Sequence, residues 1–268
     1  MTEYALKLSD VELSRYEMMA ARAGEHEGDR WAAAGVIEGA VVADIGCGPG
    51  AVSIALARHV GPTGRVLAFD QAPEAVEMAR AVAERAGVAN VTVEVADADA
   101  TGAAPGSVDV AMIRHVLAHN GGREAAIVAH AASVVRPGGC VYLVDTDGSG
   151  VRTRPSDPDI DDLGHRYWQW HVRQGNDPSV GLRLDELLAG AGVEVVEFSG
   201  RYDISSPPPG ARPPVWAARE ALVASGLATG EDVARWEAAF VRADGLEPRP
   251  TVFVPMFCAF GRRPATGR

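Results

Sequence analysis

The chain has 268 residues, of which 47% are hydrophobic, 23% charged and 6% aromatic, an ordinary globular profile. Its formal charge of -11 at pH 7 would repel a phosphate backbone, and no basic tract offsets it, so we expect no nucleic-acid partner. We also expect no membrane span, because no window approaches the ~18 apolar residues that one requires. The N-terminus lacks the apolar core of a signal peptide, and three widely separated cysteines fit reduced thiols, which favours a cytoplasmic location.

The first part of the chain predicts a helix over residues 9–23 and a short helical stretch that ends near Gly35. From residue 41 apolar runs alternate with amphipathic stretches. This rhythm predicts strands at 41–46, 65–70, 91–97, 108–115 and 140–147, and helices at 50–60, 73–86 and 121–134. Strands joined by helices imply right-handed crossovers and a parallel sheet that helices cover on both faces.

After residue 150 the alternation becomes irregular. The remaining elements predicted from the pattern are helices at 157–173 and 181–190, a strand at 193–200, a proline-rich connector at 207–214, helices near 215–225 and 230–243, and a strand at 251–261. We therefore predict one α/β domain, a Rossmann-like, seven-stranded, mostly parallel sheet with helices on both faces, helical cap inserts and an N-terminal lid helix. The predicted parts are a core at about 35–150 and 181–206 with 251–262, cap inserts at about 151–180 and 207–248, and a lid at 1–34.

A glycine-rich segment, VADIGCGPG at 42–50, joins the first predicted strand of the sheet to a helix. Its first two glycines and Ala51 satisfy the dinucleotide pattern G-x-G-x-x-A, and Asp70 ends the next strand, where an acid could bind the ribose of either of two cofactors. Asp44 favours one of them. A carboxylate beside the loop would repel a pyrophosphate, whereas it suits the α-ammonium group of S-adenosylmethionine.

The sequence resembles the class I S-adenosylmethionine-dependent methyltransferases, in motif detail over about residues 35–150 and more loosely over the whole chain. The motifs that carry the resemblance are VADIGCGPG (42–50), AFD (68–70), ADAD (96–99), IRHVLAH (113–119) and VRPGGCVYLVD (135–145). The resemblance implies that S-adenosylmethionine is the cofactor and that the protein is a methyltransferase.

The resemblance also implies a role for each matching residue. The backbone around Gly46, Gly48 and Gly50 would approach the methionine and ribose parts of the cofactor, and Asp44 would lie near the ammonium group. The other implied cofactor contacts are Asp70 with the ribose hydroxyls, Gln71 against the adenine, Asp97 with the adenine amino group, Ala98 through its backbone amide, and Arg114 and His115 beneath the cofactor. Asp70 and Asp97 could instead be strand-end acids that cap the following turns.

Candidates for chemistry follow the fourth and fifth predicted strands, because open α/β sheets bind ligands at the carboxyl ends of their strands. His119 is the first candidate for a general base, since imidazole titrates near neutral pH; His115 and Asp145 are further catalytic candidates. His119 could instead cap the helix at 121–134, and Asp145 could orient a histidine or cap a connection. His115 and His119 could also suggest a metal site together with Asp145, but there is no further close carboxylate, and we expect no metal.

The acceptor is less well specified by the sequence. An aromatic patch in the predicted helix at 157–173 could line an acceptor pocket or pack onto the body of the protein; its members are His165, Tyr167, Trp168, Trp170 and His171. The same two roles, lining the acceptor pocket or packing onto the body of the protein, remain open for Arg201 and Tyr202. We predict methyl transfer to a small organic acceptor in bacterial secondary metabolism, with O- or N-methylation favoured and a homodimer left open. The alternatives are an NAD(P)-dependent oxidoreductase, which Asp44 disfavours, and a catalytically inactive S-adenosylmethionine-binding protein.

Overall fold

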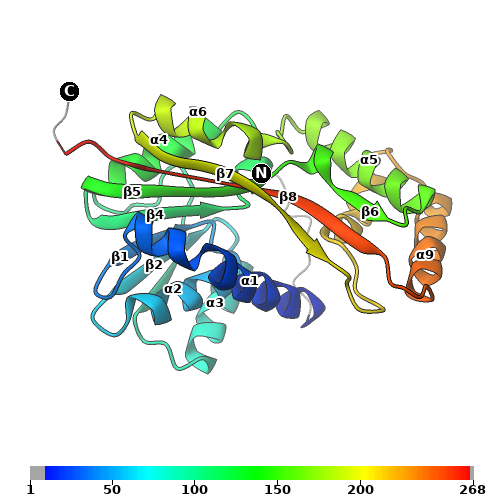
Figure 1. Cartoon of the computed structure of the whole chain (residues 1–268), viewed down its shortest axis with the longest axis horizontal. Coiled ribbons are helices and arrows are strands. Elements are labelled where there is room, and N and C mark those ends of the chain that lie inside the picture. The colour runs from blue at the N-terminus through cyan, green and yellow to red at the C-terminus, as the bar shows by residue number, and fades with distance from the viewer. Residues whose placement is uncertain (1–9, 266–268) are drawn as a thin grey trace.

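The computed structural model describes residues 10–265, with side chains from residue 20 onward except 21 and 22. Within that range eight strands form one sheet (Figure 1). They are β1 (Val41–Ile45), β2 (Arg65–Asp70), β3 (Val91–Val95), β4 (Val108–Arg114), β5 (Val135–Thr146), β6 (Arg152–Arg154), β7 (Glu194–Ser205) and β8 (Thr251–Arg262). The order is β3-β2-β1-β4-β5-β8, and β7 pairs with the far side of β8. β1 to β5 are parallel and β8 is antiparallel, which confirms the mostly parallel, Rossmann-like sheet.

Helices cover both faces of this sheet (Figure 1). One face carries α1 (Asp10–Ala34), α2 (Ala51–Val60) and α3 (Pro73–Arg85), and the other carries α4 (Glu124–Val134) and α6 (Leu184–Gly190). Alternate residues of the strands supply a separate apolar core to each face, as expected for side chains that point to opposite sides of a pleated strand. In β1, Val42 packs toward α1 and α2, whereas Ala43 and Ile45 pack toward α4 and α6.

The segments after β5 and β7 pack on each other although they are distant in sequence. Their helices are α5 (Pro158–Arg173), α7 (Pro214–Ala217), α8 (Arg219–Ala224) and α9 (Gly230–Asp244). These four helices share a core of their own that includes Leu163, Leu222 and Trp236, each fully buried. Figure 1 places α5 and α9 beyond the carboxyl ends of β4 and β5. We refer to these four helices together as the helical cap.

Three local predictions differ from the structure. The helix α1 is continuous over its 25 residues, whereas we predicted a break between residue 23 and Trp31. The strand β5 begins at Val135, five residues before the predicted start, because the Pro-Gly-Gly segment is accommodated by a register shift against β4. The strand β6, which we did not predict, raises the number of strands in the sheet from seven to eight. It has three residues, too few to show an alternating pattern. The first nine residues of the predicted lid lie outside the described residues.

No helix among residues 10–265 is long and apolar enough to cross a lipid bilayer.

Candidate cofactor and acceptor site

The glycine loop between β1 and α2 adopts a backbone that only glycine tolerates without strain. Gly46, Gly48 and Gly50 have φ angles of 78°, 52° and 81°, all in the left-handed region. A Cβ atom on Gly46 would clash with Val116, which follows β4. The amide of Gly46 donates to the Phe69 carbonyl at 2.7 Å, so the loop is fixed to the end of β2. The loop is thus held close against the carboxyl ends of β2 and β4.

Asp44, the acid ahead of the loop, is buried in the face that α1 and α2 cover. Its exposed fraction is 2%, and its carboxylate accepts a hydrogen bond of 2.6 Å from the Ser53 hydroxyl in the first turn of α2. Burial raises the pKa of Asp44 to about 6, against the opposing effects of the Ser53 hydrogen bond and the Arg114 charge. At neutral pH a costly negative charge therefore lies next to the loop, and a cationic ligand group would stabilise it.

The buried charge predicts a pH-dependent effect of Asp44→Asn. Because the folded-state pKa is raised from 3.8 to about 6, the free energy of unfolding falls as pH rises through this window. The ionised group costs about 3 kcal/mol at pH 7. We expect the ligand-free variant to be more stable than the wild type at pH 7 by about 1–3 kcal/mol, with little difference at pH 4. Urea unfolding at both pH values measures this, and an equal difference at both would contradict it.

Asp70, at the end of β2, already has structural partners. One carboxylate oxygen accepts from the Gly48 amide at 2.8 Å, and the other accepts from the Ala72 amide at 2.9 Å. The turn-capping role that the sequence left open is therefore present. It does not exclude ribose binding, because each carboxylate oxygen has two lone pairs and uses one here. Gln71, next along the chain, is exposed.

The residues after β3 are more open than those after β2. Asp97 is exposed, with one carboxylate oxygen 3.6 Å from the Arg123 guanidinium, and Ala98 is half-buried beside it. Arg123 binds Asp99 more closely, at 2.6 Å. Sequence reasoning did not identify Arg123, which orders the acidic turn from a position 24 residues away from Asp99.

Arg114, at the end of β4, points to the same face of the sheet as Asp44 and forms a buried ion pair. Its guanidinium donates to a carboxylate oxygen of Glu27 at 2.7 Å, and the Tyr142 hydroxyl donates to the other oxygen at 3.2 Å. Glu27 is fully buried in α1, and the Arg114 Nε has no hydrogen-bond partner within the described residues. The sequence missed Glu27. Its signal was an acid on the apolar stripe of α1, which also carries Ala20, Ala23, Trp31 and Ala34.

The Glu27 ion pair predicts a stability effect for Glu27→Gln. The variant keeps a hydrogen-bonding side chain but removes the charge that neutralises the buried Arg114, so we expect the free energy of unfolding to fall by about 2 kcal/mol. Glu25→Gln, at an exposed acid two residues earlier, should change it by less than about 0.5 kcal/mol. Denaturant unfolding compares the two variants; similar losses would show that Glu27 does not anchor α1.

His115 and Asp145 lie close together, but Asp145 mainly supports the backbone. The His115 Nδ1 is 3.9 Å from the Asp145 carboxylate, and His115 has a positive φ of 56°. The buried Asp145 accepts from the amides of Ala118 at 3.2 Å and Thr146 at 2.9 Å. Burial raises its pKa to about 6. Asp145 therefore caps the short 3-10 helix Leu117–His119 after β4, whereas the sequence left open a cap of the connection that follows β5.

His119 ends this 3-10 helix and faces the helical cap. No side chain caps α4 at its first turn, so His119 does not have the capping role considered as the alternative to a base. His119 keeps contact with solvent, yet protein surrounds it, and this desolvation lowers its pKa. Its ring centroid lies 4.9 Å from that of His171 in α5. The aromatic patch of α5 thus reaches the carboxyl end of β4.

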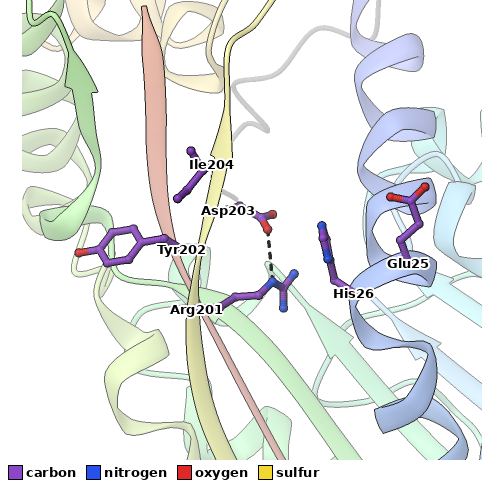
Figure 2. Close-up of a pocket in the computed structure, with 6 residues that line it drawn as sticks. All are labelled: Glu25, His26, Arg201, Tyr202, Asp203 and Ile204. Atoms are coloured by element: carbon purple, nitrogen blue, oxygen red, sulfur yellow. Dashed lines mark hydrogen bonds and ion pairs between the residues drawn. The ribbon is translucent and has the colours of Figure 1, made fainter.

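A cavity of about 310 Å³ lies between α1 and β7 (Figure 2). Glu25 and His26 line it from α1, and residues 201–204 line it from β7. Figure 2 shows Arg201 and Asp203 pointing toward α1, with Arg201 Nε 3.3 Å from Asp203, and Tyr202 pointing the other way. Arg201 is also 3.8 Å from Glu27, so the cavity is adjacent to the Arg114 ion pair. No group of three or more metal-binding side chains suited to an ion occurs among the described residues.

Comparison with known proteins agrees with this geometry. Residues 42–139 match a family model described as a methyltransferase domain. An uncharacterized 37.1 kDa protein in a transposon of Streptomyces fradiae is 33% identical over 153 residues, 57% of this chain and 43% of that protein. The chain therefore spans less than half the length of that relative.

Two further proteins are similar over more of their length. A demethylmenaquinone methyltransferase of Lactococcus lactis is 25% identical over 202 residues, 69% of this chain and 80% of that enzyme. A solved structure of a putative methyltransferase from Bacillus halodurans shares the fold with a TM-score of 0.60 at 20% identity, covering 90% of this chain and all of that one. Over residues 42–139, and in its strand order and glycine loop, the chain is similar to the class I S-adenosylmethionine-dependent methyltransferases.

Proposed function

We propose that the protein transfers the methyl group of S-adenosylmethionine to an oxygen or nitrogen atom of a small organic acceptor. One observation carries the proposal: a glycine loop in the left-handed conformation, with the buried Asp44 behind it, meets Asp70 at the carboxyl edge of the sheet. The setting that we propose is bacterial secondary metabolism in the cytoplasm, in line with the bacterial relatives. A homodimer is part of the same proposal.

The residues present fit this cofactor. A Cβ atom on Gly46 or Gly50 would collide with Val116 or Ala79, so glycine lets the loop pack this closely on its neighbours. Asp70 has free lone pairs for two hydroxyls, and Arg114 has an unpartnered buried N–H for a carboxylate. We assign the adenine to Gln71, Asp97 and Ala98. When bound, S-adenosylmethionine supplies an electrophilic methyl group.

The chain's own residues position the acceptor and manage its proton. Methyl transfer needs the nucleophile aligned with the methyl group and the sulfur, so much of the rate depends on orientation. His119 is the base that we propose for an acceptor hydroxyl or amine, since its lowered pKa leaves the imidazole free to accept a proton at neutral pH. His115 and Asp145 hold the backbone on which His119 lies. We propose that α1 and the helical cap exclude water from this edge.

A turnover assay tests the proposal. The protein is incubated with S-adenosylmethionine and a panel of phenols, carboxylic acids and amines, and S-adenosylhomocysteine is quantified by mass spectrometry. We expect S-adenosylhomocysteine and a methylated product in equal amounts with at least one oxygen or nitrogen acceptor. Tight binding of the cofactor with no product across the panel would favour the catalytically inactive alternative.

A further inference from the structure

The buried histidine of the helical cap, His171, has a tautomer that its neighbours determine. The amide of Gly121 donates to the Asn176 side-chain oxygen at 3.0 Å, so the Asn176 nitrogen faces the His171 Nδ1, also at 3.0 Å. A carboxamide nitrogen only donates, and His171 Nδ1 must therefore accept. In a neutral imidazole the proton then lies on Nε2. Burial lowers the pKa of His171 to about 4, so the ring is neutral at physiological pH.

This Nε2–H group has no hydrogen-bond acceptor within the described residues, although His171 is only 3% exposed. Buried donors are normally paired, so an unpaired one in a native fold indicates a bound partner or a functional role. The ring next to it that contacts solvent is His119, with centroids 4.9 Å apart.

Two aromatic side chains of α5 also surround the His171 ring. The ring of Tyr167 lies 4.4 Å from that of His171 and the ring of Trp170 lies 5.0 Å from it, both edge to face. The 3-10 helix that carries His119 begins next to Val116, the residue that contacts the glycine loop at Gly46. The His119–His171 pair therefore connects the helical cap to the turn that packs on the cofactor loop.

We propose that His171 donates its Nε2–H to the oxygen of a phenolic or enolic acceptor while His119 takes the proton from that oxygen. The proposal rests on the methyltransferase function above and specifies its acceptor. The hydroxyl proton goes to the His119 imidazole; the oxygen forms its bond to the methyl carbon as the sulfur–methyl bond breaks. The products are a methyl ether, S-adenosylhomocysteine and a protonated His119, which releases its proton to solvent.

The donor at His171 selects an oxygen nucleophile over a nitrogen one. A phenolate oxygen has three lone pairs, so it can accept from His171 and still attack the methyl group. A neutral amine has one lone pair, and a hydrogen bond from His171 would occupy the pair that must attack. The aromatic walls suit a planar ring beside the hydroxyl. The structure thus favours O-methylation within the broader proposal.

The test uses a matched pair of variants, His171→Gln and His171→Met. The glutamine amide nitrogen can replace the Nε2–H donor, whereas the methionine side chain has similar bulk and no N–H. The probe is 4-nitrophenol, whose visible absorption reports its ionisation, titrated into the complex with S-adenosylhomocysteine. We expect the wild type and the glutamine variant to bind it as the phenolate, and the methionine variant to bind it at least about 10-fold more weakly. Affinity for 4-nitroaniline should be equal in all three.

The outcomes separate this inference from the function on which it rests. Calorimetry with S-adenosylhomocysteine comes first; no binding would overturn both. If it binds but the methionine variant holds 4-nitrophenol as tightly as the wild type, or the wild type does not bind it, only the role of His171 is overturned. Should the variants fail to fold, nitrogen-15 NMR of the wild-type imidazoles decides: the Nε2–H tautomer at His171 supports the assignment, and the Nδ1–H tautomer overturns it.

Discussion

Asp70→Ala is expected to weaken the binding of S-adenosylmethionine by about 10²- to 10⁴-fold, because two ribose hydroxyls lose a charged acceptor worth about 1.5–3 kcal/mol each. The carboxylate also orders the loop through the Gly48 and Ala72 amides, so its removal disturbs the backbone that contacts the rest of the cofactor. Isothermal titration calorimetry with S-adenosylhomocysteine measures the change.

Asp70→Asn is the control for this loop. The asparagine keeps one acceptor oxygen for the backbone, so the loop should remain ordered while the charge on the ribose hydroxyls is lost. We expect an affinity between those of the wild type and the alanine variant. If the alanine variant bound the cofactor as tightly as the wild type, Asp70 would be a turn cap and no more.

His119→Gln is expected to lower turnover by about 10²- to 10⁴-fold, the usual contribution of a positioned general base, with S-adenosylhomocysteine affinity changed by less than about threefold. The glutamine fills the same space and can form hydrogen bonds, but it does not accept a proton at neutral pH. Single-turnover kinetics and calorimetry give the two quantities. An equal loss in affinity and in turnover would assign His119 to binding or folding instead.

The pH dependence of the wild type provides a second check on His119. Desolvation lowers its pKa, so the base is unprotonated at neutral pH. Turnover should therefore stay level through neutral pH and fall only on the acid side, as the imidazole takes up a proton. A fall that begins above the ordinary pKa of histidine would contradict a desolvated base.

The local part of the site could be predicted from the sequence because short-range geometry determines it. A strand, a left-handed glycine turn and a helix follow from residues 41–60 alone, and Asp44 and Asp70 take their places from strand ends. The contact of Asp145 with the Thr146 amide is also local, since a strand-end acid commonly binds the next free amide.

The parts that were missed depend on contacts between distant segments. Glu27 and Arg114 are 87 residues apart, and nothing in a periodic pattern pairs them; only the docking of α1 on the sheet does so. Likewise, the tautomer of His171 depends on Asn176 and on the backbone of Gly121, 55 residues before Asn176. The three-residue β6 gave no pattern, because its pairing with β8 comes from tertiary structure.

The buried Asp44 and the buried Arg114–Glu27 ion pair lie on the same face of the sheet. Asp44 lies behind the glycine loop, Arg114 offsets part of its charge, and Glu27 links Arg114 to α1 and to the cavity beside Arg201.

Calorimetry of the wild-type protein with S-adenosylhomocysteine and, separately, with NADH tests the central claim most directly. The buried Asp44 beside the loop predicts binding of the first ligand and none of the second, because its carboxylate suits an ammonium group and repels a pyrophosphate. Binding of NADH with no binding of S-adenosylhomocysteine would contradict the account.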